Sequence, residues 1–442
     1  MDAKARAETR RIPFLLGGLA GNLFTAGSFA TLVKLIGAVK VAVTARYFGA
    51  GGELDAYLIA FLLPSFFADV LAGSIRSALV PALLHRPEAA RNLCQSVLTA
   101  GTALLGGVAI LLAAGAYLIP LPGVRSELVR PLLLVLLPVL PLSAMSTTWR
   151  SALNAHRQFW VAAAIPAITP LLSIALLIAT ANRWGVFVLA LGTLGGNIIE
   201  ASVLAVAARR IGYRVTPRWS RESVEELRDV FAQYVPMVAG ALVLGGSTFI
   251  DQGFATLLGT GGIAVLTYGT KLTSVLLALG PAALGTAILP YLSRMSAEGD
   301  WVGIRQATRR FVLVIGAVTI PLTAILIVFS EPLIRLYLQR GQFSAQITGE
   351  VARVQQFSLI HIPIAVTLAL AMGLTASMRA NRLFLRVALL GLVVNAVSDL
   401  VLMRYLGAAG IAASDAVAGL AMLVYLSVLL NRLTCRSVSS TS

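Results

Sequence analysis

Apolar runs of about 20 residues or longer recur from one end of this chain of 442 residues to the other. A helix needs about 20 mostly apolar residues to span a bilayer, so each run is long enough to be one. Lipid also explains how a chain with 58% hydrophobic and 12% charged residues can fold, because water would leave too much apolar surface exposed. We predict an all-α, polytopic membrane protein with about 12 transmembrane helices. The predicted spans are 20–47, 54–84, 92–120, 129–153, 159–181, 185–208, 230–258, 263–293, 309–338, 350–378, 384–405 and 409–432.

The longest connection between two spans, 209–229, is rich in arginine and glutamate and divides the spans into two sets of six. We predict two pseudo-symmetric lobes joined by this linker. The polar, basic start leads directly into an apolar run that is too long for a signal peptide. The predicted parts are a basic tail (1–19), an N-lobe (20–208), a cytoplasmic linker (209–229), a C-lobe (230–432) and a C-terminal tail (433–442).

Lysine and arginine are distributed unevenly over the two sides of the predicted membrane. Of the 35 cationic residues, 23 lie on the side of the N-terminus and seven on the opposite side. Five more fall inside spans or at their edges: Lys34, Lys40, Arg76, Lys271 and Arg353. Positive charge favours the cytoplasmic side, so we predict that both termini are cytoplasmic. Topology therefore explains the net charge of +16 better than a nucleic-acid partner does.

Short motifs repeat in the two halves. The sequence FGAGG (48–52) precedes the second span and LGTGG (258–262) precedes the eighth, and these spans contain LVP (79–81) and ILP (288–290) near their ends. Six helices per half give both halves the same orientation. Parallel repeats of this kind are typical of secondary transporters, whose substrate path lies between the halves.

Three lysines lie in predicted spans, where an ionisable side chain is costly and therefore indicates function. Lys34 and Lys40 are in the first span and Lys271 is in the eighth. Together they predict a cationic cavity suited to phosphate or diphosphate, which lysine binds as a point charge. The alternative for Lys40 and Lys271 is that the side chain extends to the membrane interface.

Carboxylate and amide side chains gather in the second half. Asp251 lies in the seventh span, and the twelfth contains Ser414 and Asp415. Asn395 and Asp399 are four residues apart in the eleventh, so they share one face of a helix. Such oxygens suit a hard cation, and we predict a sodium site here. The alternative is hydrogen bonding that only joins the helices.

Other polar groups in the spans have less specific interpretations. Asp55 follows FGAG and is a candidate cap for the start of the second span. Asp69 and Glu200 are candidates for proton carriers or for partners of a cation such as Arg76.

The sequence contains no motif for ATP binding or for catalysis. It lacks the GxxxxGK[ST] phosphate loop, and Cys94 and Cys435 are too far apart to indicate a disulfide framework or a metal site. His156 and His361 lack neighbours with metal-ligand spacing, so we interpret them as structural. We predict a transporter without a cofactor, driven by an ion gradient, the membrane potential or downhill substrate flow, and not an enzyme.

The segment 34–81 is similar to the MurJ/MviN lipid II flippase family of the multidrug/oligosaccharidyl-lipid/polysaccharide superfamily. The similarity rests on Ala45-Arg46, FGAG (48–51), DAY (55–57), Pro64 and Val80-Pro81, and in the second half on LTYGTKL (266–272) and GTAILP (285–290). It extends over most of the chain. It implies alternating-access transfer of a polyprenyl-diphosphate-linked saccharide from the inner to the outer leaflet of the bacterial inner membrane.

The family's cavity arginines fall on Lys34, Lys40 and Lys271, which keep the charge but not the bidentate geometry. A family aspartate matches Asp55, and an arginine early in the second span is replaced by Ala68. The resemblance thus implies a substrate-binding set of Lys34, Lys40, Lys271, Asp55, Arg46 and Arg76. It also implies sodium ligands at Asp251, Asn395, Asp399 and, near the remaining position, Asp415.

Family members typically carry two further C-terminal helices, whereas this sequence ends soon after the twelfth predicted span. Together with the lysines, this favours an exopolysaccharide precursor as the substrate over lipid II. The expected partners are the lipid-linked oligosaccharide and membrane lipid, with the protein acting as a monomer. An antiporter for drugs or metabolites is the alternative, which a dye-efflux test would distinguish; a membrane polymerase or transferase would require a larger extramembrane loop than 338–350.

Overall fold

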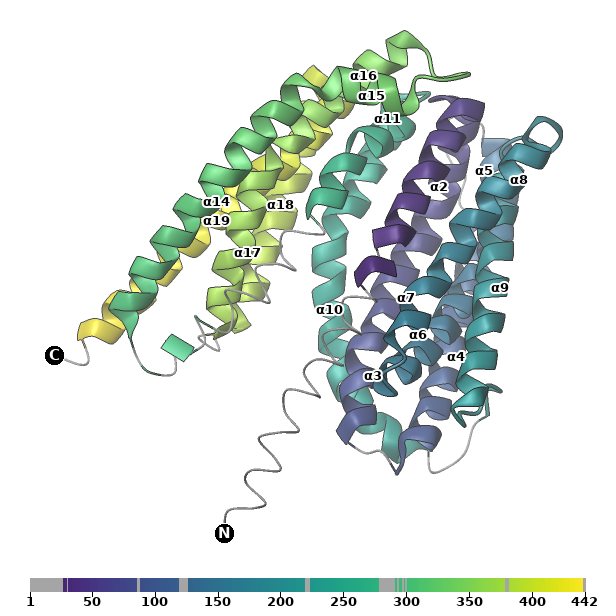
Figure 1. Cartoon of the computed structure of the whole chain (residues 1–442), viewed down its shortest axis with the longest axis horizontal. Helices are drawn as coiled ribbons and strands as arrows, with labels where there is room; N and C mark the ends of the chain where they lie inside the picture. The colour runs from purple at the N-terminus through teal and green to yellow at the C-terminus, as the bar shows by residue number, and fades with distance from the viewer. Residues whose placement is uncertain are drawn as a thin grey trace. The chain divides into compact units, whose positions relative to one another are not determined.

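The computed structural model describes residues 27–29, 31–85, 88–118, 126–218, 223–277, 291, 294–295, 298, 300–377 and 381–439. Within these residues every regular element is helical, which confirms the predicted fold class (Figure 1). Eleven of the described helices are long and apolar enough to cross a membrane. A shorter apolar helix, Gly262–Leu277, begins where we predicted the eighth span. The predicted N-terminal tail and the ILP motif lie outside the described residues.

The helical elements follow the predicted spans within a few residues at most positions. The first is the helix Gly27–Phe48. The others are α2 (Gly52–Phe67), a π-helix (Ala68–Ala72), α3 (Gly73–His85), α4 (Ala90–Leu118), α5 (Ser126–Leu136), α6 (Val139–Ala155), α7 (Phe159–Ala164), a 3-10 turn (Ile165–Ala167), α8 (Ile168–Trp184), α9 (Phe187–Arg210), α10 (Ser223–Ala255), a 3-10 turn (Thr256–Leu258), α11 (Gly262–Gly269), α14 (Trp301–Val328), α15 (Ser330–Leu338), α16 (Ala345–Leu359), α17 (His361–Ser377), α18 (Asn381–Leu406) and α19 (Ala408–Ser439).

The ninth predicted span, 309–338, is wrong at both ends. Helix α14 already begins at Trp301 and ends at Val328, and α15 is a separate helix that starts at Ser330. Pro332 has no backbone N–H to bond to the carbonyl of Val328, so an uninterrupted helix would lose a hydrogen bond here.

Several long helical segments contain internal irregularities, and two of them contain prolines near a boundary between the two compact units of the chain. The segment from Gly52 to His85 contains Pro64 and then the π-helix at Ala68–Ala72. Helix α10 contains Pro236. Both kinds of feature interrupt the regular hydrogen bonding of an α-helix and are common causes of bends.

The chain forms two compact units. The first comprises residues 1–44, 63–121 and 127–239, and the second comprises 45–62, 122–126 and 240–442. The lobe boundaries that we placed at 208 and 230 stay a prediction.

In the first unit, α6 packs against α3, α4 and α9, and α8 runs beside α9 (Figure 1). The contact between α8 and α9 is close because α9 presents small residues to it. A Cβ atom added at Gly192 would lie 2.9 Å from the Cα atom of Ser173. Small residues allow two membrane helices to approach in this way. Leucines such as Leu98, Leu140 and Leu153 are fully buried in the same unit.

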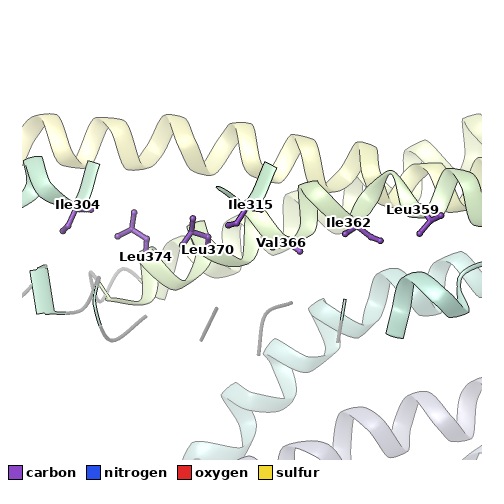
Figure 2. Packing of buried hydrophobic residues seen from close by; sticks show 7 residues of the cluster. All are labelled: Ile304, Ile315, Leu359, Ile362, Val366, Leu370 and Leu374. Carbon is purple, nitrogen blue, oxygen red and sulfur yellow. The ribbon is translucent and has the colours of Figure 1, made fainter. Parts of the chain in front are cut away.

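In the second unit, α19 packs against α16, α17 and α18, and α14 packs against α17. Figure 2 shows an apolar cluster along α14, α17 and the end of α16. Its buried members are Ile304, Ile315, Leu359, Ile362, Val366, Leu370 and Leu374. Much of the outer surface is also apolar: Leu313 of α14 is 64% exposed and Ile110 of α4 is 70% exposed. Lipid-facing helices require such a surface, which water would disfavour.

Candidate functional site

The predicted substrate-binding cations lie on both units. Lys34 and Lys40 belong to the first unit, in the helix Gly27–Phe48, and Lys271 belongs to the second, in the helix Gly262–Leu277. Lys34 and Lys271 are exposed, whereas Lys40 is half-buried. Protein atoms therefore leave the ammonium groups of Lys34 and Lys271 accessible to a ligand, to water or to lipid.

Glu200 has a different partner from the one that the sequence suggested. Its carboxylate forms an ion pair with Arg150 of α6 and accepts a hydrogen bond from the hydroxyl of Thr169 of α8 at 3.2 Å. Arg76 lies close enough to Arg150 to repel it but is itself exposed. The ion pair joins α6 to α9, and the hydrogen bond from Thr169 adds α8. We therefore interpret Glu200 as a structural residue inside the first unit.

Asp55 caps a helix, but not the start of α2. Both of its carboxylate oxygens accept backbone hydrogen bonds from the start of α11: Oδ2 from the N–H of Gly261 and Oδ1 from the N–H of Ala264 at 3.0 Å. The carboxylate is buried, at 2% exposure, and it compensates both the unpaired N–H groups and the positive end of the helix dipole.

The two glycine-rich repeats contact each other inside the second unit, where a Cβ atom added at Gly261 would lie 2.7 Å from the carbonyl oxygen of Ala50. The Tyr268 hydroxyl donates to the carbonyl of Gly49 at 3.1 Å, and the N–H of Gln342 donates to the carbonyl of Arg46 at 2.9 Å. A Cβ atom at Gly49 would lie only 2.7 Å from the carbonyl oxygen of Gln342. We call the segments 46–55, 259–268 and 339–343 together the glycine junction. The predicted substrate-binding residue Asp55 is buried there, whereas the side chain of Arg46 is exposed.

Replacing Asp55 with alanine removes the cap and leaves two buried N–H groups without their acceptor. We expect the free energy of unfolding to fall by about 1–2 kcal/mol. Thermal unfolding of the purified protein in detergent would measure this change. Asp69→Ala is the matched control, because Asp69 is an exposed aspartate in the same helical segment. Equal melting temperatures for the Asp55 variant and the unaltered protein would contradict the capping role.

Gly49 has a φ angle of +56°, in the left-handed region that favours glycine. We expect Gly49→Ala to destabilise the fold by about 1–2 kcal/mol, because the new methyl group adds the clash with Gln342 to the backbone strain. Gly37→Ala is the control, since a Cβ atom there meets nothing within 4 Å in the middle of a helix. Thermal unfolding of the two variants should rank Gly49→Ala clearly below Gly37→Ala; the reverse order would argue against a tight junction.

The predicted cation ligands come together in the second unit. Asp251 of α10 lies near enough to Asp399, Asn395 and Asp415 to interact with all three. Ser414 links α19 to α18, because its hydroxyl donates to Asp399 Oδ1 and accepts from Asn395 Nδ2 at 3.1 Å. Asp251, Asn395 and Asp399 are buried.

Three oxygens of this cluster are buried and have no hydrogen-bond partner in the described part of the chain: Asp251 Oδ1, Asn395 Oδ1 and Asp399 Oδ2. Buried carboxylates that face one another without partners require protons or a cation. No three acidic, cysteine or histidine side chains among the described residues form a ready-made metal site. The oxygens of the cluster belong to carboxylate and amide groups, which are ligands of hard cations rather than of transition metals.

His361 lies beside this cluster, which its sequence context did not indicate. It lines an open cavity of about 540 Å³ together with Asn395 and Asp415, and its Nδ1 atom is buried without a partner among the described residues. His156, by contrast, forms a 3.1 Å hydrogen bond with the hydroxyl of Tyr213. The structural interpretation is supported for His156 by this contact, and His361 also has a hydrogen-bond interaction, with the backbone of Asp415.

Comparison with known proteins identifies the family of this chain. The family model for the lipid II flippase MurJ matches residues 44–437. A protein of Synechocystis sp. named "Probable lipid II flippase MurJ" is 28% identical over 357 residues, which are 74% of this chain and 66% of that protein. A protein of Rhizobium meliloti with the same name is 26% identical over 432 residues, which are 91% of this chain and 78% of that protein.

Two solved structures share the fold. The lipid II flippase MurJ in its inward-closed conformation matches with a TM-score of 0.79 at 21% identity, over 92% of this chain and 87% of that one. An inward-facing multidrug resistance MATE transporter of the MOP superfamily matches with a TM-score of 0.74 at 15% identity, over 95% and 99%.

The fold and the eleven described spans define a multi-pass helical membrane protein that shares the fold of these two solved structures. The family match covers most of the chain, and the protein belongs to the lipid II flippase MurJ family of the bacterial inner membrane. The resemblance seen in the sequence is thereby confirmed.

Proposed function

We propose that this protein is a flippase that moves a polyprenyl-diphosphate-linked saccharide, either lipid II or an exopolysaccharide precursor, across the inner membrane by alternating access. The family match over residues 44–437 carries the proposal. The exposed ammonium groups of Lys34 and Lys271 support it, because an accessible cation inside an apolar span is costly unless it serves an anion. The protein then acts by binding and transport, without catalysis.

Side-by-side translocation assays would test this function. The full-length protein in proteoliposomes would receive fluorescent lipid II or a diphosphate-linked oligosaccharide that lacks the peptide. Transfer of either lipid above the rate of protein-free vesicles supports the proposal, and the preferred one identifies the substrate. Transfer of neither, together with efflux of a cationic dye in a pump-deficient host, would favour the antiporter instead.

A cation bound by Asp251, Asn395, Asp399 and Asp415 is the proposed coupling element. The unpartnered oxygens of the first three residues support it. When bound, a sodium ion would neutralise part of the carboxylate charge and so stabilise one conformation. It biases transport only if its affinity differs between the two conformations.

We also propose that both termini lie in the cytoplasm and that the protein acts as a monomer. We expect a reporter fused near Arg214, in the connection between α9 and α10, to report the cytoplasm. A reporter inserted near Arg340, between α15 and α16, should report the opposite side. Paired fusions of alkaline phosphatase and green fluorescent protein would measure this, and exchanged signals would reverse the proposed orientation.

A further inference from the structure

An open groove of about 970 Å³ lies in the second unit among α14, α17 and α19. Its wall is apolar, with Val312, Leu370, Leu374 and Leu423. Figure 2 shows Leu370 and Leu374 near Ile304 at one end of the apolar cluster, which continues into this wall. The groove does not include any residue of the proposed substrate or cation sites.

One end of the groove is cationic. Arg305, Thr308, Arg309 and Val312 line it from α14, and their spacing of three, four and seven residues from Arg305 places them on one face of the helix. Both arginines are exposed. The Thr308 hydroxyl is buried and has no hydrogen-bond partner among the described residues.

Helix α14 gives the groove two different environments along its length. The charged residues of α14 are confined to its first turns, up to Arg310, whereas 311–328 contains no charged residue. Arginine favours the interface and the apolar stretch favours hydrocarbon, so the groove crosses the boundary between the two. An occupant must therefore combine an anionic group with an apolar chain.

We propose that this groove binds an anionic phospholipid of the surrounding membrane. Arg305 and Arg309 bind the phosphate through charge-assisted hydrogen bonds. An acyl chain lies along Leu370, Leu374 and Leu423. Basic pockets between transmembrane helices recognise anionic head groups in this way. A soluble anion would leave the apolar wall without a ligand, and a zwitterionic lipid would lack the net charge that the arginines attract.

Native mass spectrometry of the full-length, delipidated protein titrated with phosphatidylglycerol would test the site. We expect Arg305→Gln combined with Arg309→Gln to weaken this binding about 30-fold. Arg310→Gln is the matched control, since Arg310 is an adjacent exposed arginine that does not line the groove, and it should bind as the unaltered protein does. Ala371→Phe fills the groove without changing its charge and should also weaken binding.

Three results would overturn the proposal. The first is unchanged phosphatidylglycerol binding in the double arginine variant, with its melting temperature preserved. The second is equal affinity of the unaltered protein for phosphatidylcholine, which would leave the arginines without a role. The third is tighter binding of a polyprenyl phosphate that the same variants abolish, which would assign the groove to the carrier lipid. Each measurement reports lipid binding and not transport, so it is independent of the proposed flippase activity.

Discussion

Lys34→Ala should reduce transport of the diphosphate-linked substrate by roughly 10- to 150-fold, close to the rate of protein-free vesicles. Lys34 is exposed in an otherwise apolar segment, between Leu32 and Leu35, which are exposed as well. Its ammonium group can therefore bind a phosphate without first breaking a contact that holds the fold. The substitution removes one charge-assisted interaction from the substrate and no packing from the protein.

Two further variants separate substrate binding from general charge effects. Lys34→Arg keeps the charge and should retain most of the activity. Arg183→Ala removes an exposed cation from the end of α8 and should leave transport unchanged. All variants are compared at equal amounts of protein in the vesicles. Full activity of Lys34→Ala would rule out Lys34 as a diphosphate ligand.

Asp399→Asn should abolish stabilisation of the protein by sodium. At a sodium concentration a hundred times the dissociation constant, a bound ion stabilises the folded state by about 2.7 kcal/mol. Without sodium, the difference in stability between the variant and the unaltered protein should have the opposite sign. Asparagine can still accept the hydrogen bond from Ser414 but no longer repels Asp251, so the variant should melt at a higher temperature than the unaltered protein.

Thermal unfolding in sodium chloride and in choline chloride at equal ionic strength would measure both effects. Glu331→Gln is the control, because this exposed carboxylate of α15 pairs only with Arg335, at 3.1 Å, among the described residues. It should respond to sodium as the unaltered protein does. A sodium response that survives in Asp399→Asn would exclude Asp399 as a ligand.

The helical fold was predictable because span length depends on the thickness of the bilayer and not on tertiary contacts. The error at α14 and α15 shows the limit of that argument. Hydropathy continues past Val328, but a second helix starts at Ser330, and Pro332 lies in its first turn, where a missing N–H is tolerated. The proline alone does not reveal the boundary in the sequence, since α14 continues through Pro321.

Local spacing also predicted part of the candidate cation site. Asn395 and Asp399 share a helix face at any crossing angle, and the structure places Ser414 beside both. Partners from distant helices were not predictable. The pairing of Glu200 with Arg150 depends on how α6 and α9 pack, and the capping of α11 by Asp55 depends on how the glycine junction folds. Neither arrangement has a periodicity that reveals it in the sequence.

The proline and π-helix irregularities have a mechanical consequence. Two of the places where the chain passes from one unit to the other lie inside α2, after Leu62, and inside α10, after Ala239. Pro64 lies two residues from the place in α2, and Pro236 lies three residues from the place in α10. A helix bends at least cost where a backbone hydrogen bond is already missing. We therefore expect both helices to bend at these prolines when the conformation changes, while the hydrogen bonds elsewhere along them stay intact.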